Sequence, residues 1–568
     1  MPSYDLVLVH APSVYDFRDK GLMFGPVADL IPSTPVFEMY PIGFTTIASH
    51  LFSNGYRSRI LNLAVHMLAD RSFDTERMMR KIRSSVFGID LHWLPHAHGS
   101  LEVAKLIKQY HPDSKVVLGG FSATYFWEEI MRDHPYVDAV FLGDSTELPM
   151  LEFMRSIEAQ TPPENVPNIV YRSGGKIRNN GITHIIENLD DVEFDYGLMV
   201  RSAIRSLDLT GHLPYLDWKR NPMLLISTVR GCSYGCITCM GACSSFKRNF
   251  GRERPAFRSP EKVLEDIRQI DSYFRGAIFL LGDIQQPGNG YASRLLSLLQ
   301  KERPRNEIAF EFFNPPKRDL VAKIAHSVDR FDAQISPDSH DPRVRAAHGR
   351  NYTNEALESA IHELLSSGAR RVDLFFMIGL EGQDPESAAM TVKYSDRLLQ
   401  HERAGERLLP FISPLAPFVD PGSDVFNSPD RHVYRLFART LAEHRILLLR
   451  PSWKHVLNYE TRWMNRDQIV DAAYESALGL NEAKAKAGAL TRESAEKVER
   501  RINLARAAVV HMDAALKSVD PEASLASLGE TFESLTESTV CDKRELDWNS
   551  RSFYWSIPRA LFAALLGK

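Results

Sequence analysis

Four of the five cysteines in this 568-residue chain fall within twelve residues, and this crowding limits what that stretch can form. The four are Cys232, Cys236, Cys239 and Cys243. The first three have the spacing Cys-x3-Cys-x2-Cys, which can hold three irons of a four-iron, four-sulfur cluster and leave the fourth iron open to a non-protein ligand. If Cys243 were also a ligand, the set would instead form a zinc site or a fully ligated electron-transfer cluster.

The surroundings of these cysteines indicate a loop that leaves a strand. An apolar run, residues 223–230, precedes them, and a glycine stands directly before Cys232 and before Cys236. Zinc sites with four cysteines usually consist of two separated pairs, which this stretch does not contain. The residues alone therefore favour the open cluster, while zinc remains the alternative. An open iron can bind a reactant, so the feature indicates an enzyme.

The whole chain has the composition of an ordinary globular protein. Its net charge is -4, with 44% hydrophobic and 25% charged residues, so nothing indicates a nucleic-acid partner. Its length predicts about three domains of roughly 100–200 residues each. We expect no secretory signal and no transmembrane segment, because no apolar run approaches the roughly 20 residues of a span. Clustered thiols are typical of a reducing compartment, so we expect a cytoplasmic protein.

The first part of the chain alternates short apolar runs with helical periodicity. This alternation is typical of parallel strands joined by crossover helices, and it predicts a doubly wound α/β sheet. We expect strands at residues 6–9, 58–63, 86–90, 115–120 and 139–142. Ligands of such sheets bind outside the carboxyl ends of the strands, so the loops that follow these strands are candidate binding loops.

One of these loops has a glycine pair followed by hydroxyl side chains. Gly119 and Gly120 allow a bulky ligand to approach the backbone closely. The hydroxyls of Ser122 and Thr124 can then bond a nucleotide-like tail. We therefore expect this loop to contact a ligand.

A second candidate loop, residues 90–99, is rich in imidazole. Its polar and aromatic residues are Asp90, His92, Trp93, His96 and His98. Each of the three histidines has an alternative interpretation as a surface or capping residue. A longer segment, residues 11–40, has little periodicity, and loops of that length in a compact domain are usually lids or binding loops.

Four motifs in roughly the first 150 residues resemble the cobalamin-binding domain of cobalamin-dependent radical S-adenosylmethionine (SAM) enzymes. They are Pro41-Ile42-Gly43-Phe44, Ile89-Asp90 and the segments 117–124 and 142–147. The resemblance implies that the loop with Asp90, His92 and Trp93 lines the lower face of the cobalt. The first strand is followed by Val9-His10-Ala11-Pro12-Ser13, which lacks the Asp-x-His-x-x-Gly motif of the methionine-synthase type. We therefore expect no histidine ligand to cobalt.

A second series of strand–helix units follows a proline-containing linker and a predicted hairpin at Gly174-Gly175. Expected strands at 223–230, 277–281, 308–313, 330–335 and 371–378 predict a full or partial barrel, with sites at the carboxyl ends of the strands. We expect four parts: a cobalamin-type domain at 1–160, the linker and hairpin at 161–220, the barrel at 221–407, and a mainly helical domain at 408–568.

Residues 224–383 resemble the partial barrel of radical SAM enzymes. By this resemblance Cys232, Cys236 and Cys239 hold a 4Fe-4S cluster, and the amino and carboxylate groups of SAM chelate the open iron. Gly282 and Asp283 take the place of the family's Gly-Gly-Glu, which meets the methionine amino group. The aspartate has the shorter reach.

The same resemblance implies contacts at two later strand ends. Ser336 and Asp338 fall where the family contacts the ribose and carboxylate of SAM, and Gly379 falls where backbone flanks the adenine. The chain departs from the family at Thr238, where an aromatic residue is usual. Cys243 lies outside the motif, and we expect it to be a buried neighbour, since a fourth thiolate would block the open iron.

The remaining segments carry weaker signals. We expect helices at 431–444, 466–487 and 492–517, the last with Thr491 as its N-cap. The charged segment 341–353 is interpreted as a solvated face, with binding of an anionic substrate as the alternative. The aromatic segment 453–463 either closes the open side of the barrel or forms an inter-domain core. The apolar segment 553–566 is expected to dock on the protein.

Together the two resemblances imply a cobalamin-dependent radical SAM enzyme whose cofactors are a 4Fe-4S cluster, SAM and cobalamin. The implied reaction is methylation of an unactivated carbon through a 5'-deoxyadenosyl radical and methylcobalamin. A cyclase or ring-rearranging enzyme is the alternative, followed by a non-enzymatic electron-transfer or sensor protein. The expected partners are a small-molecule or lipid-like substrate and a reductant such as flavodoxin or ferredoxin. No side chain is assigned as a catalytic acid or base, because this chemistry needs no strong one.

Overall fold

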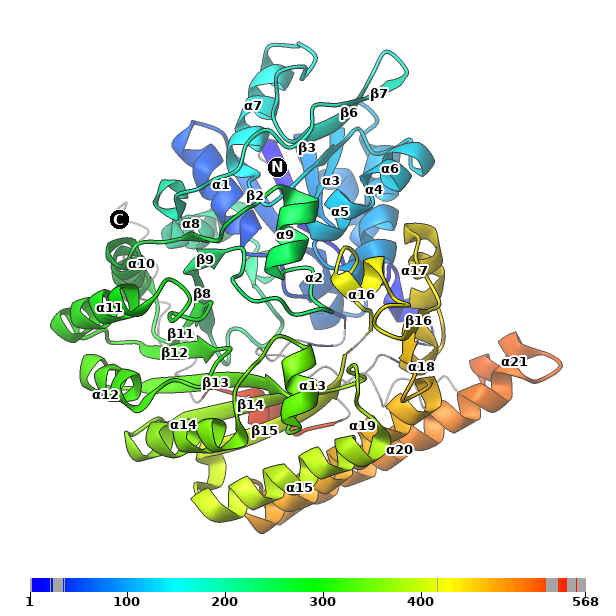
Figure 1. The fold of residues 1–568 in the computed structure, drawn as a ribbon. Helices are drawn as coiled ribbons and strands as arrows, with labels where there is room; N and C mark the ends of the chain where they lie inside the picture. The colour runs from blue at the N-terminus through cyan, green and yellow to red at the C-terminus, as the bar shows by residue number, and fades with distance from the viewer. Residues whose placement is uncertain are drawn as a thin grey trace.

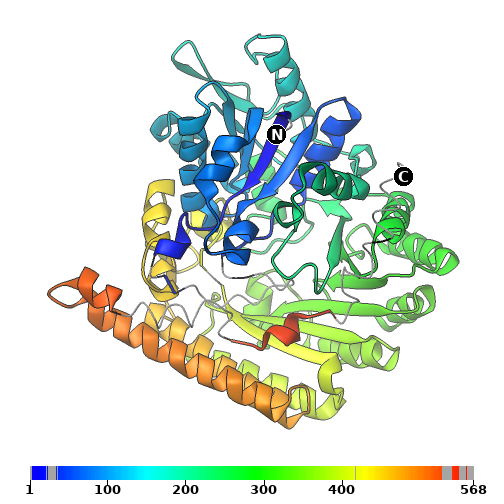
Figure 2. The same cartoon turned by 180° about the vertical axis from the view of Figure 1, so that it is seen from behind.

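The computed structural model describes residues 3–20, 22–23, 34, 36–415, 417–527, 540–548 and 558. Figure 1 shows an N-terminal α/β sheet above a second sheet, and Figure 2 shows both from behind. Two long helices, α19 (Arg466–Lys486) and α20 (Arg492–Leu516), cross the foot of the molecule below the second sheet. The apolar segment 553–566 lies outside the described residues, apart from Pro558.

Among the described residues, the first sheet has seven strands in the order β2-β1-β3-β4-β5-β6-β7. They are β1 (Ser3–His10), β2 (Ser58–Asn62), β3 (Arg83–Asp90), β4 (Lys115–Gly119), β5 (Ala139–Phe141), β6 (Ile169–Ser173) and β7 (Lys176–Asn179). Strands β1 to β5 pair in parallel, which confirms the predicted doubly wound sheet.

Both faces of this sheet are buried beneath helices. In β1, Leu6 and Leu8 belong to one hydrophobic core, and Val7 and Val9 belong to the other. The helices of the domain are α1 (Gly43–Ser53), α2 (Leu63–Ala69), α3 (Thr75–Lys81), α4 (Ala97–Tyr110), α5 (Phe121–Tyr125), α6 (Trp127–Asp133) and α7 (Glu147–Glu158). Burial on both faces explains why the strands are continuous apolar runs in the sequence.

The predicted hairpin forms as β6 and β7, joined at Gly174 and Gly175, which both have positive φ. Strand β6 pairs antiparallel with β5, so the hairpin extends the first sheet beyond residue 160. The chain then reaches the second sheet through α8 (Tyr196–Ser206) and a 3-10 turn, η4 (Thr210–His212). Helix α8 contacts α1 of the first domain and α10 (Pro260–Tyr273) of the second, so it lies between them.

In the described part of the chain, the second sheet has six parallel strands in the order β15-β14-β13-β12-β11-β8. They are β8 (Met223–Ser227), β11 (Ala277–Leu281), β12 (Glu307–Phe312), β13 (Phe331–Asp338), β14 (Arg371–Ile378) and β15 (Leu408–Pro414). The longer helices between them are α10, α11 (Asn289–Glu302), α12 (Arg318–Ser327), α14 (Asn354–Ser366) and α15 (Pro385–Glu402), and the shorter ones are α9 (Cys243–Phe250) and α13 (Pro342–Ala347). Strands β8 and β15 are the two edges, so the barrel is partial, as predicted.

Strand β15 lies after residue 407, where we expected the barrel to end. Pro410 and Pro414 concealed it in the sequence, because proline lacks the N–H that a strand donates to its neighbour. An edge strand tolerates this loss, and β15 pairs with β14 alone among the described strands.

The prediction of a helix at residues 431–444 is wrong. Strand β16 (Tyr434–Leu436) occupies that range and pairs with β17 (Tyr459–Thr461). Helix α17 (Leu441–Leu448) begins only after Thr440, because Thr440 and Glu443 form a capping box there.

The other two predicted C-terminal helices are confirmed as α19 and α20. Thr491 caps α20 by accepting a hydrogen bond from Ser494 N. Among the described residues, no helix combines the length and the apolar character that a membrane span requires.

Candidate active site

The cysteine-rich loop leaves the second sheet after β8 and the short strand β9 (Val229–Arg230), which pairs with β10 (Ala256–Phe257). Cys232 and Cys236 are half-buried, and Cys239 and Cys243 are exposed. The expectation that Cys243 is a buried neighbour is therefore wrong. It is the first residue of helix α9 (Cys243–Phe250), where its backbone N–H donates to Tyr234 O (2.9 Å) and its side chain lies at the surface.

Backbone N–H groups of the loop point at two of its thiols. Tyr234 N donates to Cys232 Sγ (3.4 Å), and Gly241 N donates to Cys239 Sγ (3.2 Å). Such donors stabilise a thiolate, so the loop fits the ligand set of an iron–sulfur cluster. Burial raises the pKa of Cys232 to about 11, so its thiol is protonated without metal and releases a proton when metal binds.

A single metal ion needs ligands that meet at one point. In the part of the chain that the structure describes, no three His, Cys, Asp or Glu side chains are placed to hold one. The thiolates of a cluster bind separate irons, so this finding does not conflict with a three-cysteine cluster site.

Asp283, the residue in the place of the family's glutamate, follows β11 and is 2% exposed. Its carboxylate accepts hydrogen bonds from Gln285 N (2.8 Å), Phe313 N (3.0 Å) and Tyr234 Oη (3.3 Å). Burial raises the pKa of Asp283, and these donors oppose the rise. The side chain joins the ends of β11 and β12 to the cysteine loop, so both of its oxygens already have partners.

Glu311, the residue before the last of β12, is a second buried acid that the sequence analysis missed. Among the described residues its carboxylate accepts one hydrogen bond, from Gly282 N (2.8 Å). Burial raises the pKa of Glu311 to about 7, and the charge of Asp283 adds to this. Glu311 pairs in register with Gln334 of β13, so the two share one face of the sheet. The sequence signal that could have revealed Glu311 is a charged residue within an otherwise apolar strand.

Asp338 and Arg350 form a buried ion pair beside the cysteine loop. The Arg350 Nε lies 2.6 Å from Asp338 Oδ2, and Arg350 also donates to Phe313 O (3.0 Å). Burial lowers the pKa of Arg350, but the charges of Asp338 and Cys236 outweigh this and raise it. Ser336, two residues before Asp338 on β13, is half-buried. The Arg350 guanidinium therefore lies close enough to Cys236 for their charges to interact, while Asp338 balances its positive charge.

The charged segment 341–353 is not the solvated face that we expected. Arg345 and Arg350 are buried, whereas Arg343 is exposed. Burial is tolerated because the guanidinium groups have acceptors: Arg345 donates to Ser339 O (2.9 Å) and Tyr352 O (2.8 Å). The density of charged residues in this segment did not predict their burial, because the acceptors are carbonyls that only the folded chain brings close.

Gly379, the predicted neighbour of adenine, is buried after β14 with a φ of 95°. Its N–H donates to Gln383 Oε1 (2.9 Å), and its carbonyl accepts from Tyr434 Oη (3.1 Å). A Cβ atom at this position would lie 2.2 Å from Tyr459 Oη, so the tyrosine requires a glycine here.

The aromatic segment 453–463 forms an inter-domain core, one of its two predicted interpretations. Trp453 and Tyr459 are both buried. Trp453 Nε1 donates to Tyr474 Oη (2.9 Å) on α19, and Trp453 N donates to Met23 O (3.0 Å) in the first domain. The segment therefore joins the C-terminal helices to the long loop after β1.

Asp90, at the end of β3, is held by a histidine from the neighbouring strand. His10 places Nδ1 2.9 Å from Asp90 Oδ1 and Nε2 3.0 Å from Phe37 O. Burial would raise the pKa of Asp90, but the charge of His10 outweighs burial and lowers it. One Asp90 oxygen thus ties two strand ends together, while Oδ2 is buried without a hydrogen-bond partner in the described structure.

The histidines of the second candidate loop are not surface residues. His96 and His98 are buried and His92 is half-buried. Burial lowers the pKa of each to about 4, so all three are neutral near pH 7. Trp93 beside them is 44% exposed and packs edge-on against His92, with ring centroids 4.7 Å apart. The loop therefore presents an uncharged aromatic surface.

The glycine loop packs tightly against this aromatic surface. Gly120 has a φ of 115°, and a Cβ atom there would lie 2.5 Å from the Cα of His92. The hydroxyl of Ser122 donates to His92 O (3.2 Å), and that of Thr124 donates to Gly120 O (2.9 Å). Both hydroxyls therefore bind backbone carbonyls of the two loops that include Gly119 and His92. Their contact with a ligand stays a prediction.

Aromatic rings connect these first-domain loops to the helix that follows the cysteines. Phe121 lies with its ring centroid 4.3 Å from that of His92, and on its other side 5.4 Å from Phe246 and 4.9 Å from Phe250 of α9. Since α9 begins at Cys243, the predicted cobalamin loops and the predicted cluster loop face each other across one aromatic contact.

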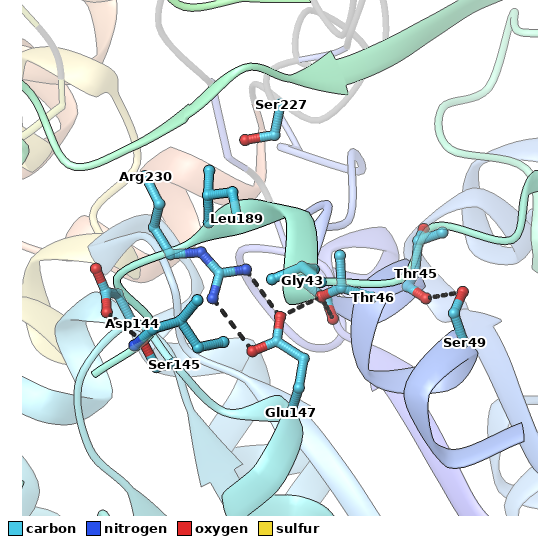
Figure 3. A network of polar contacts seen from close by, with 12 residues as sticks. Gly43, Thr45, Thr46, Ser49, Asp144, Ser145, Glu147, Leu189, Ser227 and Arg230 are labelled. Carbon is cyan, nitrogen blue, oxygen red and sulfur yellow. Dashed lines mark hydrogen bonds and ion pairs between the residues drawn. The ribbon is translucent and has the colours of Figure 1, made fainter. Parts of the chain in front are cut away.

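A network of ion pairs fixes the same contact on the other side of the cysteines (Figure 3). Arg230, two residues before Cys232, binds Glu147 at the start of α7 through Nη2–Oε1 (2.8 Å) and Nη1–Oε2 (3.1 Å). Thr46 Oγ1 donates to the same carboxylate (2.7 Å). Beyond α9, Arg252 donates through Nη2 to Asp144 Oδ1 (3.0 Å). Both ends of the cysteine-bearing segment are thus bound to one first-domain loop.

Comparison with known families accounts for both domains. Residues 30–150 match the B12 binding domain, and residues 226–394 match the radical SAM superfamily. An uncharacterized methyltransferase of Pyrococcus horikoshii is 27% identical over 329 residues, which cover 57% of this chain and 67% of that protein.

Two solved structures share the fold. The cobalamin-dependent SAM radical enzyme OxsB, with aqua-cobalamin bound, has a TM-score of 0.57 at 11% identity and covers 100% of this chain and 81% of its own. The radical SAM methyltransferase TsrM from Kitasatospora setae, with cobalamin and a 4Fe-4S cluster bound, has a TM-score of 0.55 at 13% identity and covers 76% of this chain and 75% of its own.

A B12-binding domain joined to a radical SAM domain is the domain pair of cobalamin-dependent radical SAM enzymes, and this chain has both domains. The predicted fold is confirmed, and the predicted cofactors are confirmed at the level of these two domains. The predicted domain boundaries and the roles of individual site residues stay predictions.

Proposed function

We propose that the protein methylates an unactivated carbon of a small molecule. The observation that carries this proposal is the contact of Phe121 with α9, because it brings the loops predicted to hold cobalamin against the segment predicted to hold the cluster. When bound, these groups and SAM supply a hydrogen-abstracting radical and a transferable methyl group. A substrate carbon at their junction would meet both.

Different residues at the strand ends would bind the cluster, the carboxylate of SAM and the ammonium group of SAM. Cys232, Cys236 and Cys239 would hold the cluster, and Arg350, which pairs with Asp338 and interacts with Cys236, is our candidate partner for the carboxylate of SAM. Glu311 accepts one hydrogen bond from the described residues, so it is the better placed acid for the SAM ammonium group. Asp283 keeps the loop in place with the hydrogen bonds that its oxygens already accept.

The first domain would supply a cradle for cobalamin. The exposed ring of Trp93 and the half-buried, uncharged ring of His92, packed edge to face, would offer aromatic contacts to the corrin, and Gly120 keeps the neighbouring loop close to them. Because burial lowers the pKa of His92 to about 4, its imidazole would add no positive charge to this cradle at physiological pH. We also propose that a small electron carrier, such as flavodoxin or ferredoxin, delivers the electrons that the cluster needs.

Labelled SAM tests the proposed reaction. Reduced, anaerobically reconstituted protein is incubated with trideuteromethyl-SAM and a metabolite extract from a strain that lacks the gene. We expect one metabolite to gain three deuterium atoms, and the Cys239→Ala variant to lose this activity. A product that forms without label would contradict methylation and would favour the cyclase or rearrangement alternative.

A further inference from the structure

A cavity of about 460 Å³ lies at the open edge of the second sheet, and Tyr40 and Ile42, beside the start of α1, belong to its lining. Its walls come from α8, η4, the start of α1 and the first half of β8. Because β8 is an edge strand, the cavity occupies the side where the partial barrel does not close. Its volume falls within the range of about 300–1,000 Å³ that ligand pockets have.

The cavity wall is mainly carbon because the polar tips of its aromatic residues are bound elsewhere. Tyr196 Oη donates to Leu225 O (2.9 Å), and Trp218 Nε1 donates to Met223 O (2.8 Å). These bonds occupy carbonyls of the edge strand and leave the ring faces for the cavity. None of the described lining residues is Asp, Glu, Lys or Arg.

The described lining contains one imidazole, His212, which is uncharged and has a hydrogen-bond partner at each ring nitrogen. His212 Nε2 lies 2.8 Å from Ser202 Oγ, and Nδ1 lies 2.6 Å from Asp208 O. Burial lowers the pKa of His212 to about 4, so the ring is neutral at physiological pH. The cavity therefore offers dispersion contacts and no charge to an occupant.

The rim of the cavity exposes apolar side chains to water. Leu207 is 93% exposed, Ile204 is 43% exposed and Leu209 is 40% exposed, all at the end of α8 or just after it. A group of exposed apolar residues around a pocket marks a binding site more often than an ordinary surface.

Strand β8 connects the cavity to the cofactor end of the barrel. Leu225 lines the cavity, and Ser227, two residues later, points to the same face and is half-buried. The step between them is about 7 Å at about 3.3 Å per residue. Ser227 pairs in register with Leu281, which directly precedes Gly282. An extended molecule along this strand would have one end in the cavity and the other at the strand ends.

We infer that the cavity binds an uncharged hydrocarbon part of the substrate, such as an acyl or prenyl chain, and that the reacting carbon lies toward Ser227. The position of the reacting carbon rests on the proposed function, whereas binding of the hydrocarbon part does not. The walls, the exposed rim and the course of β8 each agree with an elongated apolar molecule that enters past Leu207.

Binding of the fluorescent fatty acid cis-parinaric acid tests the inference on the unreduced full-length protein without SAM. We expect saturable binding at one site per chain, and competition by dodecanol. Ala203→Trp, which fills the cavity from α8, should weaken binding at least tenfold. Val510→Trp, which places the same ring on the exposed face of α20, should leave it unchanged. If Ala203→Trp does not fold, Val200→Phe replaces it.

Four outcomes would overturn the inference. They are no saturable binding, equal binding by the folded cavity-filling variants, binding only after deletion of residues 549–568, and binding to phosphatidylcholine vesicles without binding of the free fatty acid. The third would assign the cavity to the chain's own C-terminal segment, and the fourth to a membrane surface. Because no turnover is involved, failure of the labelled-SAM experiment leaves this result unaffected.

Discussion

The substitution Glu147→Gln removes the charge that joins the B12-binding domain to the strand before the cysteines. Glu147 and Arg230 are 6% and 17% exposed, so the pair lies largely out of water. Glutamine keeps the volume of the side chain and one acceptor, but it leaves Arg230 without its counter-charge. We expect a loss of stability and a looser cysteine loop.

The magnitude follows from the pKa of Glu147. Burial would raise this pKa, but Arg230, helped by Thr46, outweighs burial and lowers it from 4.5 to about 2. At about 1.4 kcal/mol per pH unit, the interaction is worth about 3 kcal/mol. For a cooperative unit of 150–250 residues, that loss lowers the unfolding midpoint by roughly 6–12 °C.

Differential scanning calorimetry at pH 7 measures the shift. The stabilisation by Glu147 is complete above pH 4.5 and is lost as the pH falls toward 2, because the folded-state pKa is the lower one. The difference between wild type and Glu147→Gln should therefore shrink on acidification below pH 4.5. Glu475→Gln, in an exposed pair with Arg506, is the control and should leave the midpoint almost unchanged.

Two results would refute this reasoning. One is a midpoint for Glu147→Gln equal to that of the Glu475→Gln control. The other is a difference between wild type and Glu147→Gln that does not depend on pH between 4.5 and 2. Either would mean that the ion pair drawn in Figure 3 does not couple the domains.

Three further predictions concern the site residues. Cys243→Ala should keep the iron and sulfide content of wild type, because this exposed residue lies outside the cluster motif. Cys239→Ala should lose most of both, and an equal loss in the two variants would make Cys243 a ligand. Glu311→Gln should weaken SAM binding in equilibrium dialysis about tenfold, or about 1.4 kcal/mol, while Asp283→Asn should mainly lower the unfolding midpoint; the reverse pattern would return the ammonium contact to Asp283. Trp93→Ala should weaken cobalamin binding, followed by absorbance, without changing iron content, and unchanged cobalamin affinity would remove Trp93 from the cradle.

Local patterns in the sequence predicted most of the fold. The alternation of Leu6 to Val9 between two faces and the parallel repeats of both sheets follow from strand and helix periodicity, which neighbouring residues encode. Strand β15 escaped because Pro410 and Pro414 resemble a break, and only the position at the sheet edge makes them acceptable. The helix expected at 431–444 failed because periodicity did not reveal the pairing of β16 with β17.

The candidate site was predictable where one short motif carries it. The apolar run at 223–230 placed the loop of Cys232, Cys236 and Cys239 at a strand end, as the structure has it. The charged pairs around this loop were not predictable from a motif: Arg350 binds Asp338 across a loop, and Arg230 binds Glu147 of the other domain. Local charge density misread Arg350 as solvated, because its burial depends on a partner that only the tertiary fold supplies.

The most direct test of the account is 5'-deoxyadenosine formation from SAM by the anaerobically purified, reconstituted and reduced protein, with its metal content measured on the same sample. We predict iron and cobalamin in the protein, formation of 5'-deoxyadenosine, and loss of this product in Cys232→Ala, Cys236→Ala and Cys239→Ala. Protein that contains zinc and no iron, or iron-loaded protein that forms no 5'-deoxyadenosine, would contradict the account.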